Sequence, residues 1–136
     1  MRFALRSFGS KVYEARLRRA QNGREKAGMD DLSPEAHSEF HVLVTDDSRE
    51  IRELLFEALT SIHCNVTCVK DGLEALSSLE TRPYDLLITD YQMPHLDGLA
   101  LLRRIQTSPC KPPAILITGQ SSAELIEEAQ LAGVSS

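Results

Sequence analysis

Three acidic residues follow apolar stretches of the sequence, where the ends of strands are expected. Asp46 and Asp47 follow the run 42–45, and Asp90 follows the run 86–89. If these runs are neighbouring parallel strands, their ends lie about 5 Å apart and the three carboxylates converge. Unpaired carboxylates repel one another, so at least one pKa should rise. Mg²⁺ would relieve the repulsion, because it binds oxygen ligands and shares its remaining positions with water and phosphate.

A hydroxyl and a glycine follow another apolar run. Thr118 and Gly119 come directly after residues 114–117. The Thr118 hydroxyl would donate a hydrogen bond to an oxyanion bound beside Asp90, and a glycine lets the backbone approach closely. A carboxylate, Mg²⁺ and a hydroxyl together describe a phosphoryl site in which Asp90 is the nucleophile and forms an acyl phosphate.

Each of these residues also has a purely structural interpretation. Asp46 and Asp47 could be the acidic start of a helix, which the helix dipole favours, and Thr118 could be an ordinary β-branched strand residue. For Asp97-Gly98 we prefer the interpretation as a turn and helix cap. Asp90 differs, because a carboxylate that ends an apolar strand has no structural reason to be there.

Strands and helices alternate regularly from residue 41 onward. Strands are predicted at 41–46, 65–69, 85–90 and 114–118. The helix caps that the pattern predicts are Ser48, Asp71 and Ser121-Ser122. Glu74 completes a capping box with Asp71, and Gly133 can end the last helix. The helix after Ser48 has an apolar stripe at helical spacing, comprising Ile51, Leu54, Leu55, Ala58, Leu59 and Ile62.

This alternation predicts an α/β fold with a doubly wound parallel sheet. The helices are long enough for right-handed crossovers between parallel strands. The runs 85–90 and 114–118 are apolar almost throughout, as expected of strands that helices cover on both faces. Ligands bind such sheets at the carboxyl ends of the strands, which is where the acidic residues and Thr118 fall.

The formal net charge of −5 conceals two segments of opposite sign. Residues 1–28 carry eight Lys or Arg and two acidic residues, a charge of +6. Residues 29–136 carry seven Lys or Arg and eighteen acidic residues, a charge of −11. An acidic globular part opposes direct nucleic-acid binding, because phosphate contacts dominate that affinity. No apolar run approaches the roughly 18 residues that span a bilayer, so we predict no transmembrane segment.

The basic segment 1–28 has an apolar stripe at helical spacing, interrupted by Gly9-Ser10. The stripe comprises Met1, Leu5, Phe8, Val12 and Ala15. Such an extension could be a membrane-surface helix, an organellar presequence or a partner-binding helix. It could also be disordered or untranslated, with Met29 as the start. Residues 29–39 are predicted to be an acidic linker, and residues 40–136 to form the globular domain.

The three cysteines, Cys64, Cys68 and Cys110, do not form a disulfide or metal framework. Cys64 and Cys68 share one face of a predicted strand, but no further ligand lies at zinc spacing, so we interpret them as buried side chains. An odd cysteine count without a secretory signal fits the reducing cytosol, and a cytoplasmic location is predicted.

Asp46-Asp47, the stretch 90–98 and Ile117-Thr118-Gly119 together resemble the receiver domain of two-component response regulators. The stretch 90–98 reads D-x-x-M-P-x-x-D-G, a highly specific signature, and the resemblance covers about residues 40–134. It implies a flavodoxin-like fold with strand order 2-1-3-4. It also implies a signalling protein rather than an enzyme, one whose only reaction is its own phosphorylation.

The resemblance assigns roles to individual residues. Asp90 corresponds to the phosphorylated aspartate and Thr118 to the switch hydroxyl. The implied Mg²⁺ ligands are Asp46, Asp47, Asp90 and the backbone carbonyl of Gln92. Gln92 and Gln120 stand where the family tunes dephosphorylation. The expected partners are a histidine kinase or histidine phosphotransfer protein and a downstream regulator.

The family pattern continues with a fifth strand, which ends in a lysine that contacts the phosphoryl group, and a fifth helix. The sequence stops at Ser136, where that strand should begin, so we expect both elements to be missing. Lys70, after the second strand, and Lys111, at the opposite end of the sheet, do not replace the lysine. The fourth strand would be left as an open apolar edge, and residues 1–28 are one candidate to complete the domain.

Two other interpretations remain open. The missing lysine favours a degenerate receiver that docks a kinase or another regulator without phosphorylation, or a truncated remnant without function. An aspartyl phosphatase or phosphotransferase of the haloacid-dehalogenase type would also use an Asp nucleophile and Mg²⁺ at strand ends. That class needs a second acid two residues past the nucleophile, where this chain has Gln92, so we disfavour it.

Overall fold

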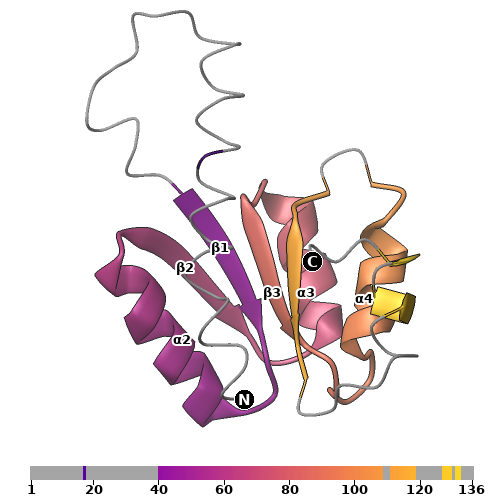
Figure 1. Cartoon of the computed structure of the whole chain (residues 1–136), viewed down its shortest axis with the longest axis horizontal. Coiled ribbons are helices and arrows are strands. Elements are labelled where there is room, and N and C mark those ends of the chain that lie inside the picture. The colour runs from indigo at the N-terminus through magenta and orange to yellow at the C-terminus, as the bar shows by residue number, and fades with distance from the viewer. Residues whose placement is uncertain (1–16, 18–39, 109–110, 119–126, 130, 133–136) are drawn as a thin grey trace, which may run out of the picture.

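The computed structural model describes residues 17, 40–108, 111–118, 127–129 and 131–132. Strands and helices alternate along the chain (Figure 1). The elements are β1 (Phe40–Thr45), α2 (Arg49–Ser61), β2 (Cys64–Val69), α3 (Gly72–Thr81), β3 (Leu86–Asp90), α4 (Gly98–Ile105) and β4 (Ala114–Ile117). Each predicted strand is present, with ends that differ from the prediction by a single residue at most.

The four strands form one parallel sheet in the order β2-β1-β3-β4, which confirms the predicted order. β1 pairs with β2 on one side and with β3 on the other, and β4 pairs with the outer edge of β3. The register sets Thr45 opposite Thr89 and Asp90 opposite Ile117. The carboxyl ends of β1, β3 and β4 therefore meet at the same end of the sheet.

Apolar side chains form a core on each face of the sheet. On one face α2 packs against β1 and β2, and its Leu55 and Leu59 join side chains from all four strands. On the other face the core draws on α3 and α4, together with Ala129 and Ala132. β3 and β4 carry buried side chains on both faces, as their continuous apolar runs predicted.

α2, α3 and α4 each begin after a residue whose side chain caps the helix. The Ser48 hydroxyl accepts a hydrogen bond from the backbone N–H of Ile51 at 3.5 Å. The carboxylates of Asp71 and Asp97 each accept one from the N–H three residues on, both at 2.8 Å. These predicted caps are confirmed, whereas the predicted cap at Ser121-Ser122 lies outside the described residues.

The apolar stripe predicted for α2 is only partly buried. Leu55 and Leu59 are buried, but Leu54 is 48% exposed and Ile62, which caps the helix, is 39% exposed. Consecutive residues on a helix point about 100° apart, so only one of Leu54 and Leu55 can face the sheet squarely. Helical spacing located the helix correctly, but the stripe does not indicate how many of its side chains are buried.

Gly98 brings the start of α4 against the end of β3. Its N–H donates a hydrogen bond to the Tyr91 carbonyl at 2.8 Å. A β-carbon at position 98 would lie 2.3 Å from the carbonyl oxygen of Asp90, far inside van der Waals contact. Asp97-Gly98 is therefore a turn and cap as predicted, and the glycine is also required by the space beside Asp90.

We expect Gly98→Ala to lower the free energy of unfolding by about 1–3 kcal/mol, because α4 or the end of β3 must move to admit the methyl group. Urea denaturation would measure the change. Ser77→Ala, at an exposed position of α3, is the control and should stay within about 0.5 kcal/mol of the wild type. A Gly98→Ala variant as stable as the wild type would contradict the close contact.

Candidate functional site

The carboxylates of Asp46, Asp47 and Asp90 come together at the carboxyl end of the sheet. One oxygen of each lies within 4.8 Å of the others. The pairing of β1 with β3 brings them together, because two of the residues follow β1 and the third ends β3. Asp46 is buried, Asp90 is half-buried and Asp47 is exposed. The predicted convergence of the three side chains is therefore observed, with solvent access on the side of Asp47.

Burial and repulsion from neighbouring carboxylates disfavour charge on Asp90 and on Asp46. Burial raises the pKa of Asp90 to about 6, and the negative charges of Asp46 and Asp47 contribute to the rise. Hydrogen bonds from the backbone at Tyr91 and Gln92 lower the pKa but do not cancel the effect of burial. Burial is also the main reason that the pKa of Asp46 is raised. A divalent cation fits this all-oxygen set, since its charge would offset the repulsion.

Hydrogen bonds at the start of α2 hold Asp46 in position. Its carboxylate accepts a hydrogen bond from the Ser48 N–H at 2.8 Å, and the Arg52 guanidinium donates to its backbone carbonyl at 2.7 Å. The N–H of Asp46 donates to the Val69 carbonyl at 3.2 Å, which continues the pairing of β1 with β2 by one residue. Asp46 is thus fixed through both its backbone and its side chain.

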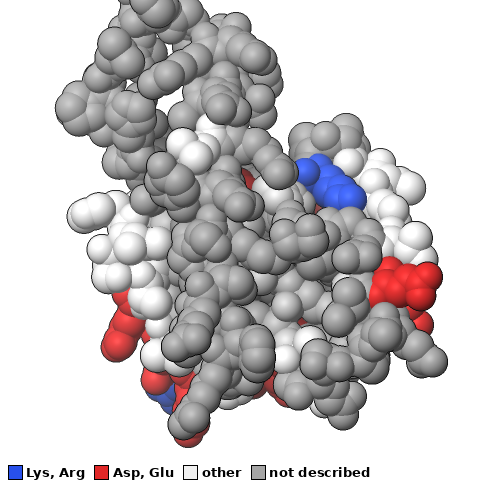
Figure 2. Space-filling view, viewed as in Figure 1, with Lys and Arg blue, Asp and Glu red and all other residues white. Residues whose placement is uncertain are grey.

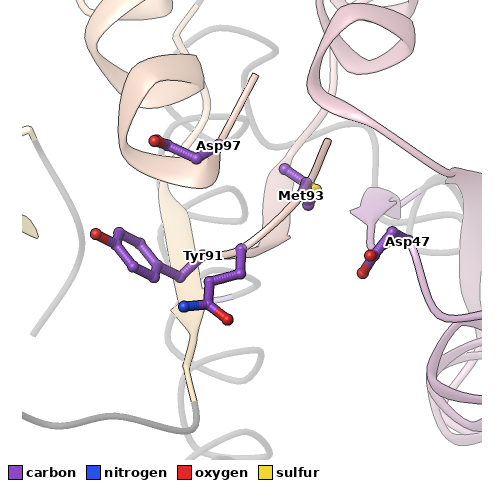
Figure 3. Close-up of a pocket in the computed structure, with 5 residues that line it drawn as sticks. Asp47, Tyr91, Met93 and Asp97 are labelled. Carbon is purple, nitrogen blue, oxygen red and sulfur yellow. The ribbon is translucent and has the colours of Figure 1, made fainter. Parts of the chain in front are cut away.

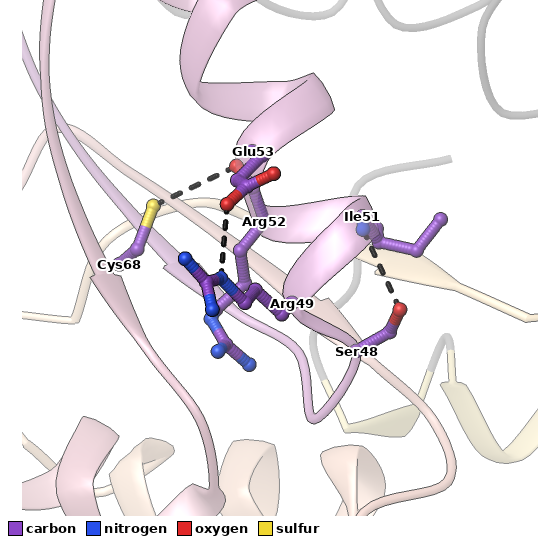
Figure 4. Close-up of polar contacts among 6 residues, drawn as sticks. All are labelled: Ser48, Arg49, Ile51, Arg52, Glu53 and Cys68. Carbon is purple, nitrogen blue, oxygen red and sulfur yellow. Dashed lines mark hydrogen bonds and ion pairs between the residues drawn. The ribbon is translucent and has the colours of Figure 1, made fainter.

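Sequence patterns do not single out Arg52, yet it supports the site. It lies on the first turns of α2, close to Ser48 and Cys68 (Figure 4). Its positive charge lowers the pKa of Asp46, against the larger effect of burial. The available signal was its position four residues after the cap Ser48, because residues i and i+4 share one face of a helix.

The two cysteines of β2 contribute to packing. Cys64 is buried in the core on the α2 side of the sheet, and Cys68 packs against that core. The Cys68 thiol lies 3.9 Å from the Arg52 carbonyl, and burial raises the pKa of this thiol. Cys64 is buried as predicted, whereas Cys68 is only half-buried, and Cys110 lies outside the described residues.

A pocket of about 440 Å³ opens beside the carboxylates (Figure 3). Its lining residues are Asp47, Tyr91, Gln92, Met93 and Asp97. Figure 3 shows Asp47 on one side, Tyr91 and Asp97 on the other, and Met93 between them. Four of the five belong to the D-x-x-M-P-x-x-D-G stretch, so the loop after β3 forms most of the wall. Sequence reasoning gave no role to Tyr91 or Met93, which the structure adds to the site.

Thr118 follows β4 directly and is half-buried. Asp90 pairs with Ile117, and the Tyr91 N–H donates a hydrogen bond to the Ile117 carbonyl at 2.9 Å. Thr118 is therefore the next residue on the strand beside Asp90, and neighbouring strands lie about 5 Å apart. The role of its hydroxyl stays a prediction. Gly119 and Gln120 lie outside the described residues.

The described part of the chain contains two lysines. Lys70 follows β2, which β1 separates from β3, and its ammonium lies 3.8 Å from the Glu74 carboxylate. Lys111 precedes β4 and so stands at the opposite end of that strand from Thr118. Within the described residues, neither lysine is placed to contact a group bound at Asp90.

A doubly wound sheet with a carboxylate cluster at its carboxyl end agrees with the family model for the response regulator receiver domain, which matches residues 42–136. The chain belongs to this family of signalling domains. The probable chemotaxis protein CheY of Rhizobium etli is 33% identical over 95 residues, which are 68% of this chain and 74% of that protein.

Longer proteins share only a part with this chain. The transcription factor SKN7 of Candida albicans is 40% identical over 80 residues, 59% of this chain and 14% of that protein. The DNA-binding transcriptional regulator NtrC of Klebsiella pneumoniae is 37% identical over 81 residues, 60% of this chain and 17% of that protein. The chain therefore spans a small fraction of these relatives.

Solved receiver domains have the same fold. The receiver domain of the Francisella response regulator 1452 superposes with a TM-score of 0.67 at 30% identity, over 70% of this chain and 78% of that one. The chemotaxis response regulator CheY4 of Vibrio cholerae superposes with a TM-score of 0.66 at 27% identity, over 69% of this chain and 80% of that one. Both the predicted fold class and the family resemblance are confirmed. Among the described residues, no helix has the length and apolar character to cross a membrane.

We expect Asp90→Asn to raise the Tm of the metal-free protein at neutral pH. Because the folded-state pKa of Asp90 is raised from 3.8 to about 6, the folded protein binds more protons than the unfolded chain between these values. Stability therefore falls as the pH rises through this window. The charged side chain costs about 1 kcal/mol above pH 6, after allowance for solvent screening of a half-exposed group.

Thermal unfolding with a chelator, near pH 4 and near pH 8, would measure this effect. The rise in Tm of Asp90→Asn over the wild type should be present near pH 8 and absent near pH 4. Added Mg²⁺ should reduce this difference, because it stabilises the wild type. Asp71→Asn is the control, because asparagine also caps helices well and Asp71 is neither part of the carboxylate cluster nor among the charges that shift the pKa of Asp90. An Asp90→Asn gain of equal size at both pH values would mean that charge at Asp90 is not its cause.

Proposed function

We propose that this protein is a phosphoacceptor that receives a phosphoryl group on Asp90 from a phosphohistidine of a histidine kinase or histidine phosphotransfer protein. The observation that carries the proposal is the cluster of three carboxylates, within 4.8 Å of one another, at the ends of β1 and β3. Membership of the receiver domain family supports it. Asp90 is the acceptor because it alone of the three ends an apolar strand.

Asp90 supplies the nucleophile in this proposal. A carboxylate oxygen bonds to phosphorus while the bond from phosphorus to the donor imidazole nitrogen breaks. The electron pair stays on the imidazole, which takes up a proton, and the product is an acyl phosphate on Asp90. A pKa of about 6 leaves the carboxylate mostly ionised at neutral pH and more basic than an ordinary aspartate.

The ligands for Mg²⁺ in this proposal are Asp46, Asp47, Asp90 and the backbone carbonyl of Gln92. When bound, the ion neutralises negative charge on the carboxylates and on the phosphoryl oxygens. Asp46 is held by its hydrogen bonds with Ser48 and Arg52, so it would offer a fixed oxygen. Asp47 is exposed and can adjust at little cost in packing.

Thr118 is the residue that senses the phosphoryl group. Its hydroxyl would donate a hydrogen bond to a phosphoryl oxygen on Asp90 and so draw the chain after β4 toward the site. Gly98 offers a second route, since its close approach to the Asp90 carbonyl couples the end of β3 to α4. The signal would leave through the exposed surface of α4.

The output of this site is a protein contact rather than chemistry on a second substrate. Residues 40–136 carry seven basic and fourteen acidic side chains, which disfavours binding to nucleic acid. SKN7 and NtrC are named as transcriptional proteins, but this chain covers 14% and 17% of them, so we do not extend that activity to it. We assign the protein to the cytoplasm, where Cys64 and Cys68 would stay thiols.

A docking module that binds its partner without phosphorylation is the second candidate. The observation that favours it is the position of Lys70 and Lys111, neither of which is placed to contact a phosphoryl group on Asp90. A receiver without such a cation would stabilise the phosphoryl oxygens through Mg²⁺ and Thr118 alone. The two candidates differ in whether Asp90 can be modified at all.

We expect incubation with acetyl phosphate and Mg²⁺ to add the mass of one phosphoryl group to the full chain, measured by intact-protein mass spectrometry. Asp90→Asn should remove the addition, and so should chelation of the metal. Asp97→Asn is the matched control, because this carboxylate lines the pocket but lies outside the cluster. It should still be modified.

Two results would count against phosphorylation on Asp90. Modification that persists in Asp90→Asn would place the acceptor elsewhere. An unmodified wild type that retains the circular dichroism and cooperative unfolding of a folded domain would favour the docking module.

A further inference from the structure

The core on the α2 side of the sheet extends beyond the strands that α2 covers. Its members from β3 and β4 are Leu86, Ile88, Ile115 and Ile117. All four are at most 7% exposed. α2 packs on β1 and β2, and Figure 1 shows it on the far side of β1 from β4. In the described part of the chain, no helix contributing to this core lies over β3 and β4.

The described residues after β4 are held on the opposite face. Ala129 and Ala132 belong to the core that α3 and α4 cover. The Gln106 side-chain amide donates a hydrogen bond to the Leu131 carbonyl at 3.2 Å, and Arg103 forms an ion pair with Glu128 at 3.7 Å. These contacts hold Glu128, Ala129, Leu131 and Ala132 on the α4 side of the sheet, so these residues do not cover Ile115 and Ile117.

We propose that residues 1–28 form an amphipathic helix that packs over β3 and β4, beside α2, and completes this core. The contact side chains would be Met1, Leu5, Phe8, Val12 and Ala15. The inference is independent of the proposed function, because it concerns the face of the sheet that α2 covers, opposite the face that α4 covers, and requires no chemistry at Asp90.

The one described residue of this segment agrees with such a helix. Leu17 is helical and is 44% exposed. At about 100° per residue, Leu17 lies about 180° around a helix from Phe8, and Phe3 lies about 140° around the helix from Phe8. A helix that buries Phe8 against the sheet would therefore turn Leu17 and Phe3 toward solvent.

Charge and length also favour this occupant. Residues 1–28 carry a charge of +6, while residues 40–136 carry twice as many acidic as basic side chains. Figure 2 shows acidic side chains at the lower end of α2 and at the right-hand edge of this view. A helix of about 17 residues is about 26 Å long, which exceeds a typical strand. The linker 29–39 can span up to roughly 36 Å, enough to return to Phe40.

The test compares two double variants of the full chain that lose the same pair of side chains. Leu5→Ser with Phe8→Ser removes them from the stripe, and Leu17→Ser with Phe3→Ser removes them from the opposite side. We expect the stripe variant to speed amide hydrogen exchange in β3 and β4 at least about tenfold and to lower Tm. The control variant should exchange as the wild type does. Equal effects from both variants, or none from either, would overturn the proposal.

A photocrosslink provides a second measurement that does not depend on the stripe variant remaining folded. Benzoylphenylalanine would replace Phe8 in one protein and Leu17 in another. On irradiation, position 8 should link within one chain to peptides that contain β3 or β4, and position 17 should not. Links between two chains would identify a second copy as the occupant. If the folded chain forms no link to β3 or β4, another segment covers them. Either a link between two chains or the absence of these links would overturn the proposal.

Discussion

The parallel pairing of β1 with β3 is the interaction on which the rest of the molecule depends. It sets Thr45 opposite Thr89, so the acids that follow one strand and the acid that ends the other share one corner of the sheet. The same pairing buries both strands on two faces and requires helices on each side. Apolar burial therefore drives an arrangement that brings like charges together, and the core must offset their repulsion.

The elements of this fold could be predicted because the signals for them are local. Apolar runs mark the strands to within one residue, and Ser48, Asp71 and Asp97 mark helix starts through the hydrogen bonds that their own side chains make. The convergence of Asp46 and Asp90 was also predictable, because parallel strands end at the same side of a sheet. The resemblance to receiver domains then supplied the strand order.

The features that escaped prediction depend on which elements meet in space. Arg52 supports the site because α2 returns past the end of β1, and Gly98 is needed because α4 begins against the Asp90 carbonyl. Neither contact follows from periodicity or composition. The exposure of Leu54 could not be predicted either. An apolar stripe indicates which side of a helix is apolar, but it does not indicate how much of that side the sheet covers.

β1 leaves the ribosome before the other three described strands, yet it occupies the interior of the sheet. Phe40 pairs with Cys64, whereas Val42 pairs with Leu86, so β2 becomes available before β3. We expect β1, α2 and β2 to assemble first, because the shorter loop closes at lower entropic cost. Until β3 is synthesised, one edge of β1 has no partner. Strand order therefore limits how quickly the nascent chain can protect this buried strand, whatever the stability of the finished domain.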